Sequence, residues 1–357
     1  MRRWIGCVMS WMVLCAVPTN AQFTSTTLFT VPYGTSADQI SLTHGSSQVE
    51  GDFVDSEYPL LLRRLRTGEF LILSKRKAAL FVQIFNSSGQ LQRVWECKES
   101  IGDLYSLDVD RRGTLYCLRY LENRDLVRKQ QVNSILSIYD SLGKQIAIEE
   151  REKLLFEKLI SNKFEFFVLD LTVDKNGMVY IPISARLEND EKKNVFIIIR
   201  FSLDNSSIDT LPGLGYPTQT PHGDLGFLNF APIEVAEEQS LRYDGTKVRL
   251  LSGDKSVITE FSLDKDNEVR YPSLAFVPTL NYLVLVDIEE VIDDKRYPLQ
   301  KRQFIILNRQ GHRVFTTHLL VPLGSRRLWD TDEAGNIYYL TCTSNGVEIR
   351  KIRLSTH

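Results

Sequence analysis

The chain has 357 residues, of which 43% are hydrophobic and 25% are charged, and its formal net charge is −2. This composition is typical of a globular protein with ample apolar residues for a core. The sequence contains no basic patch, so we do not expect a nucleic acid as a partner.

The first residues have the features of a secretory signal peptide. Two arginines precede an apolar run of 14 residues (4–17), and Ala21 suits cleavage before a glutamine. A run of this length is short for a membrane span, although a membrane anchor is the alternative interpretation. We expect residues 1–21 to be a signal peptide, residues 22–357 to be the mature domain, and the protein to be periplasmic or secreted. No later run reaches transmembrane length, so no transmembrane segment is expected after cleavage.

A short phrase recurs along the mature chain, and its clearest copies are SLDVDRRGTLYCL (106–118), DLTVDKNGMVYIP (170–182) and LWDTDEAGNIYYL (328–340). Aspartate bonds its own backbone locally and glycine accepts a positive φ, so Asp-x-x-Gly predicts a tight turn. The flanking Val, Ile, Leu and Tyr residues predict strands. We expect the aspartates of this phrase to be turn residues rather than metal ligands; they are Asp110, Asp174 and Asp332.

Looser copies of the phrase bring the number of units to six. Each unit continues into an alternating apolar stretch that closes in a polar turn such as NSSG or DSLG. Two hairpins per unit give three to four antiparallel strands, and stacked neighbours must cover their apolar faces. A ring of such blades covers both faces and leaves no long free edge. The residues at the turn glycine position of the six units are Gly68, Gly113, Gly177, Gly245, Leu280 and Gly335.

The last unit is one outer strand short, because its final apolar stretch ends at Leu354. Two apolar segments, 27–34 and 39–45, precede the first full unit and have no other assigned place. We therefore predict an all-β fold, a six-bladed β-propeller in which the N-terminal segment closes the last blade.

The phrases resemble NHL-type propeller repeats, whose core reads apolar-x-Val-Asp-x-x-Gly-x-Ile-Tyr-Val. The copies at 109–116 and 173–180 match this core well, and the copy at 331–338 matches nearly as well. The usual second-half Asn-x-Arg-Ile is largely absent. The resemblance covers most of the mature chain and implies a six-bladed propeller. The family includes binding scaffolds and a few enzymes, so the resemblance leaves the function open.

Two stretches exceed a minimal blade. Residues 149–163 place apolar side chains at helical spacing, which indicates a surface helix, an outer strand or a partner-binding face. Residues 211–232 are rich in Gly and Pro and predict a long loop, either a packed connection between blades or a binding loop. The candidate contact residues in this loop are Tyr216, His222 and Asp224.

Three cysteines remain after cleavage, Cys97, Cys117 and Cys342. An odd number at wide spacing is neither a disulfide framework nor a zinc-binding pattern, and at most one bridge can form. The five histidines have no metal-binding spacing, and the sequence contains no Gly-x-Ser-x-Gly motif and no phosphate-binding loop.

One row of residues is a candidate site, because it lies five positions before the turn on each predicted inner strand. Its members are Arg63, Asp108, Thr172, Ser240, Ala275 and Asp330. Two carboxylates and one guanidinium on the axis leave a net charge of about −1 in a confined space. The row is then either an inert ion pair in a wet channel or a site for a ligand or divalent cation, with Arg63, Asp108 and Asp330 as the candidates.

Three classes of function fit these observations. The leading one is a non-enzymatic exported scaffold without a cofactor that binds a protein, peptide or glycan. The second is a metal-dependent hydrolase of the gluconolactonase type. Such enzymes are also six-bladed propellers, and they hold a divalent metal on the axis with Glu, Asn and Asp. The row contains Asp108 and Asp330 but no Glu or Asn. The third class is a subunit of an envelope assembly, which the sequence does not separate from the first.

Overall fold

The computed structural model contains strands and no helix among the residues that it describes. It describes residues 22–355 except for 45–47, 50–51, 54–55, 78, 98–103, 120–135, 147–163, 169, 175, 188–189, 213–215, 220–224, 234–241, 253–255, 264–272, 278–281, 294–295 and 309. None of the described segments is a helix long and apolar enough to cross a membrane. The predicted signal peptide and the stretch 149–163 lie outside the described residues.

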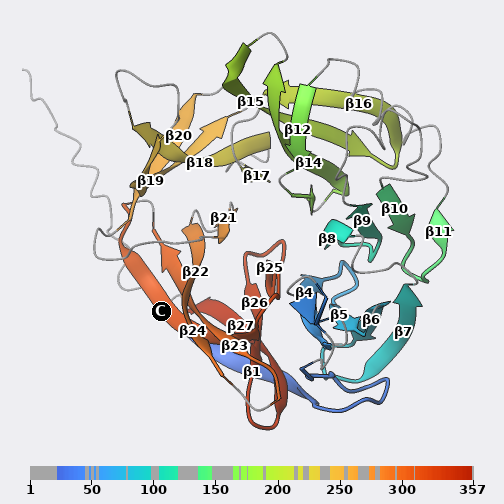
Figure 1. Cartoon of the computed structure of the whole chain (residues 1–357). Helices are drawn as coiled ribbons and strands as arrows, with labels where there is room; N and C mark the ends of the chain where they lie inside the picture. The colour runs from blue at the N-terminus through green and yellow to red at the C-terminus, as the bar shows by residue number, and fades with distance from the viewer. Residues whose placement is uncertain are drawn as a thin grey trace, which may run out of the picture.

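Six antiparallel sheets surround a central axis, which confirms the predicted six-bladed β-propeller (Figure 1). Blade 1 contains β4 (Tyr58–Arg64), β5 (Phe70–Arg76), β6 (Ala79–Phe85) and β7 (Leu91–Cys97). Blade 2 contains β8 (Leu104–Val109), β9 (Leu115–Arg119), β10 (Leu136–Tyr139) and β11 (Gln145–Ile146). In blade 3, β12 (Phe164–Val168) and β13 (Thr172–Val173) both pair with β14 (Met178–Leu187), followed by β15 (Asp190–Ser202) and β16 (Asn205–Pro212).

The second half of the chain completes the ring. Blade 4 contains β17 (Tyr216–Gln219), β18 (Leu225–Ile233), β19 (Arg242–Ser252) and β20 (Val257–Ser262). Blade 5 contains β21 (Ser273–Val277), β22 (Tyr282–Ile292), β23 (Leu299–Leu307) and β24 (Arg313–Pro322). Blade 6 contains β25 (Trp329–Thr331), β26 (Ile337–Cys342), β27 (Gly346–Ser355) and, as its outer strand, β1 (Gln22–Pro32). A small hairpin, β2 (Gln48–Val49) and β3 (Asp52–Phe53), lies outside the blades.

The N-terminal strand closes the last blade, as predicted. In the antiparallel pair of β1 and β27, Phe23 lies opposite Leu354 and Val31 opposite Val347. Figure 1 shows this pair where the first and last parts of the chain lie side by side. The segment 39–45 does not join this blade, because the chain must cross from the outer edge of blade 6 to the inner strand of blade 1. Within it, Ile40 is fully buried and forms a bridge to Tyr33.

Blade 1 holds this crossing segment through two side chains. Arg76 of β5 donates hydrogen bonds to the carbonyls of Thr35, Ser36 and Gln39. Gln83 of β6, which is fully buried, donates to the carbonyls of Ala37 and Gln39 at 2.8 and 2.9 Å. The ring is therefore closed by these side-chain contacts as well as by the strand pair.

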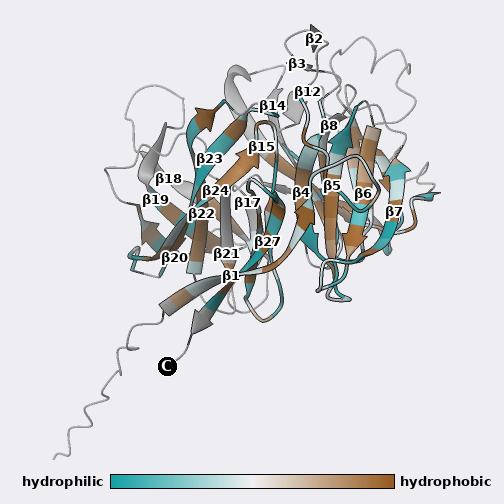
Figure 2. Ribbon diagram, turned by 90° about the horizontal axis from the view of Figure 1, so that it is seen from below, coloured by the Kyte–Doolittle hydropathy of each residue, from teal (hydrophilic) through white to brown (hydrophobic). Residues whose placement is uncertain are grey.

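Within a blade the inner strands are buried, and the outermost strand is partly exposed to solvent. Along blade 1, β5 is buried for six of its seven residues, whereas β7 alternates between exposed and partly buried positions until Cys97. Figure 2 shows the same contrast, with β5 and β6 more hydrophobic than β7. Cys97, Cys117 and Cys342 are buried thiols, and a buried cysteine packs as a small hydrophobic residue.

The Asp-x-x-Gly phrases form the predicted turns. Asp110 Oδ1 accepts hydrogen bonds from the amides of Arg112 and Thr114 at 2.8 and 2.9 Å, and Gly113 has a φ of 88°, in the left-handed region that favours glycine. The phrase also holds a tyrosine six residues after its aspartate. The Tyr338 hydroxyl donates to Asp332 Oδ2 at 2.8 Å. These aspartates are turn residues, as expected from the sequence.

Replacing Tyr338 by phenylalanine is expected to lower the free energy of unfolding by about 1 kcal/mol and to weaken acid resistance. Burial opposes ionisation of Asp332, but hydrogen bonds from Asn336 and Tyr338 outweigh it and lower the pKa of this carboxyl. A carboxylate with a depressed folded-state pKa stabilises the protein above its unfolded pKa of about 3.9, and this contribution is lost as the pH falls through the folded pKa. Without the hydroxyl, the folded pKa rises and the acid transition moves to higher pH.

Urea unfolding across the range from neutral to acid pH measures this shift. Tyr282→Phe is the matched control, because its ring packs on Phe23 at 5.4 Å and its hydroxyl bonds no described residue. An acid midpoint of Tyr338→Phe identical to that of the wild-type protein would contradict the prediction.

The predicted turn of the fourth unit is wrong. Gly245 lies inside β19, the third strand of blade 4, where the pairing with β18 shifts register between Phe230 and Ala231. The inner strand of this blade is instead β17, and Ser240, which precedes β19, lies outside the described residues. The reason is that blade 4 has no Asp-x-x-Gly phrase at its first turn. The later stretch YDGTKVRLLS, which contains Gly245 and lies in the bulged strand β19, resembles the phrase instead.

Candidate functional site

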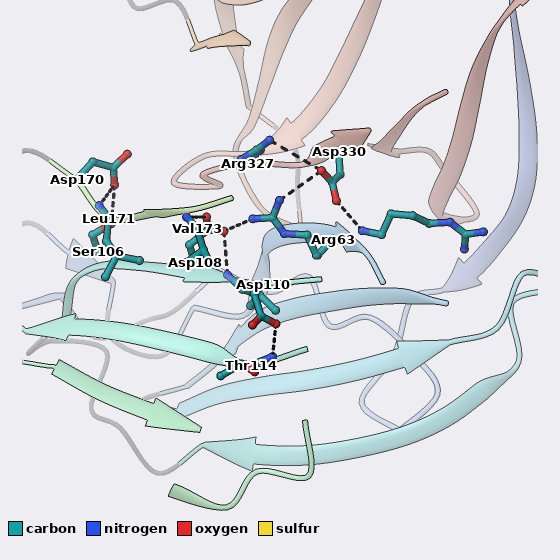
Figure 3. Close-up of polar contacts among 12 residues, drawn as sticks. Arg63, Ser106, Asp108, Asp110, Thr114, Asp170, Leu171, Val173, Arg327 and Asp330 are labelled. Atoms are coloured by element: carbon teal, nitrogen blue, oxygen red, sulfur yellow. Dashed lines mark hydrogen bonds and ion pairs between the residues drawn. The ribbon is translucent and has the colours of Figure 1, made fainter. Parts of the chain in front are cut away.

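The structure brings the three candidate residues of the inner row together at blades 6, 1 and 2. Arg63 of β4 lies between Asp108 of β8 and Asp330 of β25 (Figure 3). Its Nη2 is 2.5 Å from Asp108 Oδ1, and its Nη1 is 3.3 Å from Asp330 Oδ1. The three side chains are only 4%, 4% and 2% exposed. The remaining described members of the row, Thr172 and Ala275, lie on β13 and β21.

The charge of Arg63 is stabilised by both aspartates. Burial disfavours the charged guanidinium, but the attraction of Asp108 and Asp330 outweighs this cost and raises the pKa of Arg63. Removing charges from water costs several kcal/mol per ion, and this cost is recovered only where partners and hydrogen bonds are complete. The two carboxylates meet this condition through further bonds to the backbone.

Each aspartate also bonds the backbone of the blade that follows it in the ring. Asp108 Oδ2 accepts the Val173 amide of blade 3, and Asp330 Oδ2 accepts the Arg64 amide of blade 1, both at 2.8 Å. Val173 and Arg64 occupy equivalent positions, four residues before their turn glycines. Each aspartate accepts, in addition, the amide of the residue after it, at 2.8 and 2.9 Å. These carboxylates therefore act as bonds between neighbouring blades.

Sequence reasoning missed a fourth member of the cluster, Arg327. Its Nη2 lies 3.9 Å from Asp330 Oδ1 (Figure 3), and its guanidinium lies 5.2 Å from the centre of the Trp329 ring. Burial and repulsion from Arg63 lower the pKa of Arg327. With this residue the net charge of the cluster rises from −1 to zero. The signal was the Arg-Arg pair before LWDTD, which lies outside the aligned phrase.

Two further arginines connect blade 6 with blade 2 across blade 1. Arg326, which precedes β25, donates to Ser106 Oγ of β8 at 3.0 Å. Arg111, which follows β8, donates to the carbonyl of Thr331 at the end of β25. Ser106 in turn donates to Asp170 of blade 3 at 2.5 Å. Blades 6, 1, 2 and 3 are thus linked by polar contacts close to the axis.

The described residues of the axis do not fit a divalent cation. Calcium and magnesium need several oxygen ligands, and the two buried aspartates already bond Arg63 and backbone amides. In the described part of the chain, no group of three or more His, Cys, Asp or Glu side chains is arranged to hold a metal.

The predicted loop 211–232 is largely strand. It contains the end of β16, all of β17 and most of β18, in which Phe227 and Leu228 are buried. Tyr216 is the first residue of β17, whereas His222 and Asp224 lie outside the described residues. The glycines and prolines of this stretch suggested a loop, but its apolar residues form the first two strands of blade 4.

No known protein family and no curated protein sequence matches the chain. Solved structures with a similar arrangement include a gluconolactonase from Xanthomonas campestris, 10% identical over 92% of this chain and 98% of that one, with a TM-score of 0.45. An α-L-arabinanase from Penicillium chrysogenum is 10% identical over 93% of this chain and 98% of its own, with a TM-score of 0.48. A sialidase from Trypanosoma rangeli is 13% identical over 93% of this chain and 58% of its own, with a TM-score of 0.41. At such values the likeness says nothing about activity.

Proposed function

We propose that this chain is an exported, non-enzymatic NHL-type propeller that binds a protein, peptide or glycan partner. One observation carries the proposal, namely the saturation of the buried carboxylates of the inner row. Asp108 and Asp330 bond Arg63 and backbone amides of neighbouring blades, so neither is poised for acid, base or metal-binding chemistry. These groups support the ring, and a rigid ring presents its loops and outer strands to a partner.

The proposal includes export, with a signal peptide at residues 1–21 and a mature domain at 22–357. A mature chain that starts at Gln22 would have β1 as its first element, and this strand closes the ring. Mass spectrometry of protein recovered from the periplasm or the medium should find Gln22 at the N-terminus. Exported protein that retains Met1 would contradict the cleavage and favour the membrane anchor.

Binding and catalysis are separated by three measurements on the same preparation. We expect saturable binding on a glycan or peptide array, no turnover of gluconolactone, and no stoichiometric calorimetric response to calcium, magnesium or zinc. A metal-dependent lactonase activity that is lost in Asp108→Asn/Asp330→Asn would establish the hydrolase instead. Asp209→Asn is the control, because Asp209 is half-exposed on β16 and pairs with Arg200 at 2.8 Å, in a different blade.

A further inference from the structure

We propose that the axis at blades 6, 1 and 2 binds an oxyanion, the carboxylate or phosphate group of a ligand, with Arg327 as its main donor. This inference goes beyond the scaffold proposal, because it assigns a class of ligand to the axis and does not depend on whether the chain is a scaffold or an enzyme. It assigns the opposite ligand charge to the one that the inner row suggests from sequence alone.

The first observation is a guanidinium without a carboxylate of its own. The residues that hydrogen bonds and ion pairs join at the axis comprise four guanidinium groups and three carboxylates, and the buried Asp110 carboxylate also acts on Arg63. Arg63 forms ion pairs with two aspartates, and Arg111 donates a hydrogen bond to a carbonyl. Arg327 lies 3.9 Å from the carboxylate of Asp330, which already pairs with Arg63. The groups counted are Arg63, Arg111, Arg326, Arg327, Asp108, Asp170 and Asp330.

The second observation is a set of buried hydrogen-bond donors without acceptors. In the described part of the inner row and its flanks, these donors are Arg63 Nε, Arg64 Nη1, Arg327 Nε and Thr172 Oγ1. The Arg64 guanidinium lies over the Phe70 ring, so the other three are the donors considered for the ligand. No carboxylate oxygen in this region is in the same condition. A buried donor without a partner costs about 1–3 kcal/mol. A ligand that supplies acceptors and negative charge would pair the Arg327 charge and accept from these donors. A cation would be repelled by the guanidinium and would leave the donors without acceptors.

The third observation is access from solvent. Arg326 and Arg327 precede β25, and their side chains are 38% and 32% exposed, whereas those of Asp108 and Asp330 are buried. The Nε of Arg327 is buried, while its side chain as a whole keeps this exposed fraction. A planar guanidinium is suited to a charge-assisted, two-point contact with a carboxylate or phosphate.

Thermal unfolding and calorimetry with inorganic phosphate and with sodium acetate test the site, with sodium chloride at equal ionic strength as the reference. Ligand that binds only the folded state raises the midpoint of unfolding in proportion to its occupancy. We expect saturable stabilisation of the wild-type protein by at least one of the two anions, and at least about tenfold weaker binding by Arg327→Gln. A response to acetate alone identifies a carboxylate ligand, and a response to phosphate alone identifies a phosphate.

Arg112→Gln is the matched control, because Arg112 is half-exposed beside Arg111 and pairs with Asp204 at 3.3 Å. It should bind the anion as the wild-type protein does. Arg327→Lys keeps the charge and loses the planar fork, so it should fold even where Arg327→Gln does not, and should bind at least about threefold more weakly. The proposal is overturned if neither anion stabilises the wild-type protein more than sodium chloride does. It is also overturned if every Arg327 variant that folds binds the anion with wild-type affinity.

Discussion

Replacing Arg63 by methionine is expected to lower the free energy of unfolding by about 3–5 kcal/mol. The guanidinium contacts Asp108 at 2.5 Å and Asp330 at 3.3 Å, and both carboxylates are buried. Methionine fills a similar volume but leaves two buried negative charges without their cation. Urea unfolding of the wild-type and variant proteins, followed by tryptophan fluorescence and by circular dichroism, measures the loss.

The triple variant Arg63→Met/Asp108→Asn/Asp330→Asn separates charge from packing. It removes all three charges, while the asparagine carbonyls can still accept the amides of Val173 and Arg64. Neutral groups of similar shape often replace a buried ion cluster at little cost. We therefore expect the triple variant to recover at least half of the loss. If Arg63→Met alone lowers the free energy of unfolding by less than about 1 kcal/mol, then the cluster is hydrated and Arg63 does not hold the ring together.

Replacing Phe29 by alanine is expected to lower the free energy of unfolding by about 3–5 kcal/mol and to open the ring at its closure. Phe29 lies on β1 and is buried, and its ring packs on Phe70 of blade 1 at 5.5 Å. Gly89 of blade 1 makes room for this ring, since a Cβ there would lie 2.7 Å from it. The side chain thus joins the closing strand of blade 6 to the first blade.

Thermal unfolding and size-exclusion chromatography check this prediction together. A weakened β1 exposes the edge of β27, and an exposed edge strand promotes association between molecules, so the variant should also form larger species. Thr30→Ala is the control, because Thr30 is the neighbouring residue on β1 and its side chain is exposed. If Phe29→Ala and Thr30→Ala have the same unfolding midpoint, the closure does not depend on this contact.

The repeat architecture was readable from the sequence because it depends on local chemistry. An aspartate that bonds its own backbone, a glycine with positive φ and flanking β-branched or aromatic residues define a turn wherever they occur. Three strong copies, at Gly113, Gly177 and Gly335, therefore located three blades, and the missing outer strand of the last unit located the closure. Blade 4 was misread because its first turn lacks this chemistry, and the alignment moved to Gly245 inside β19.

The composition of the axial cluster was only partly readable. The repeat register placed Arg63, Asp108 and Asp330 in one row, and the ring brought them into contact. The contacts of Arg326, Arg327 and Arg111 have no register in the repeat, because they come from the flanks of inner strands and cross from one blade to another. Partners such as Arg326 and Ser106 are 220 residues apart in sequence and meet only when the ring closes. Local propensity thus determined the blades, whereas the tertiary structure decided the charge balance at the axis, because electrostatic interactions depend on distance in space rather than along the chain.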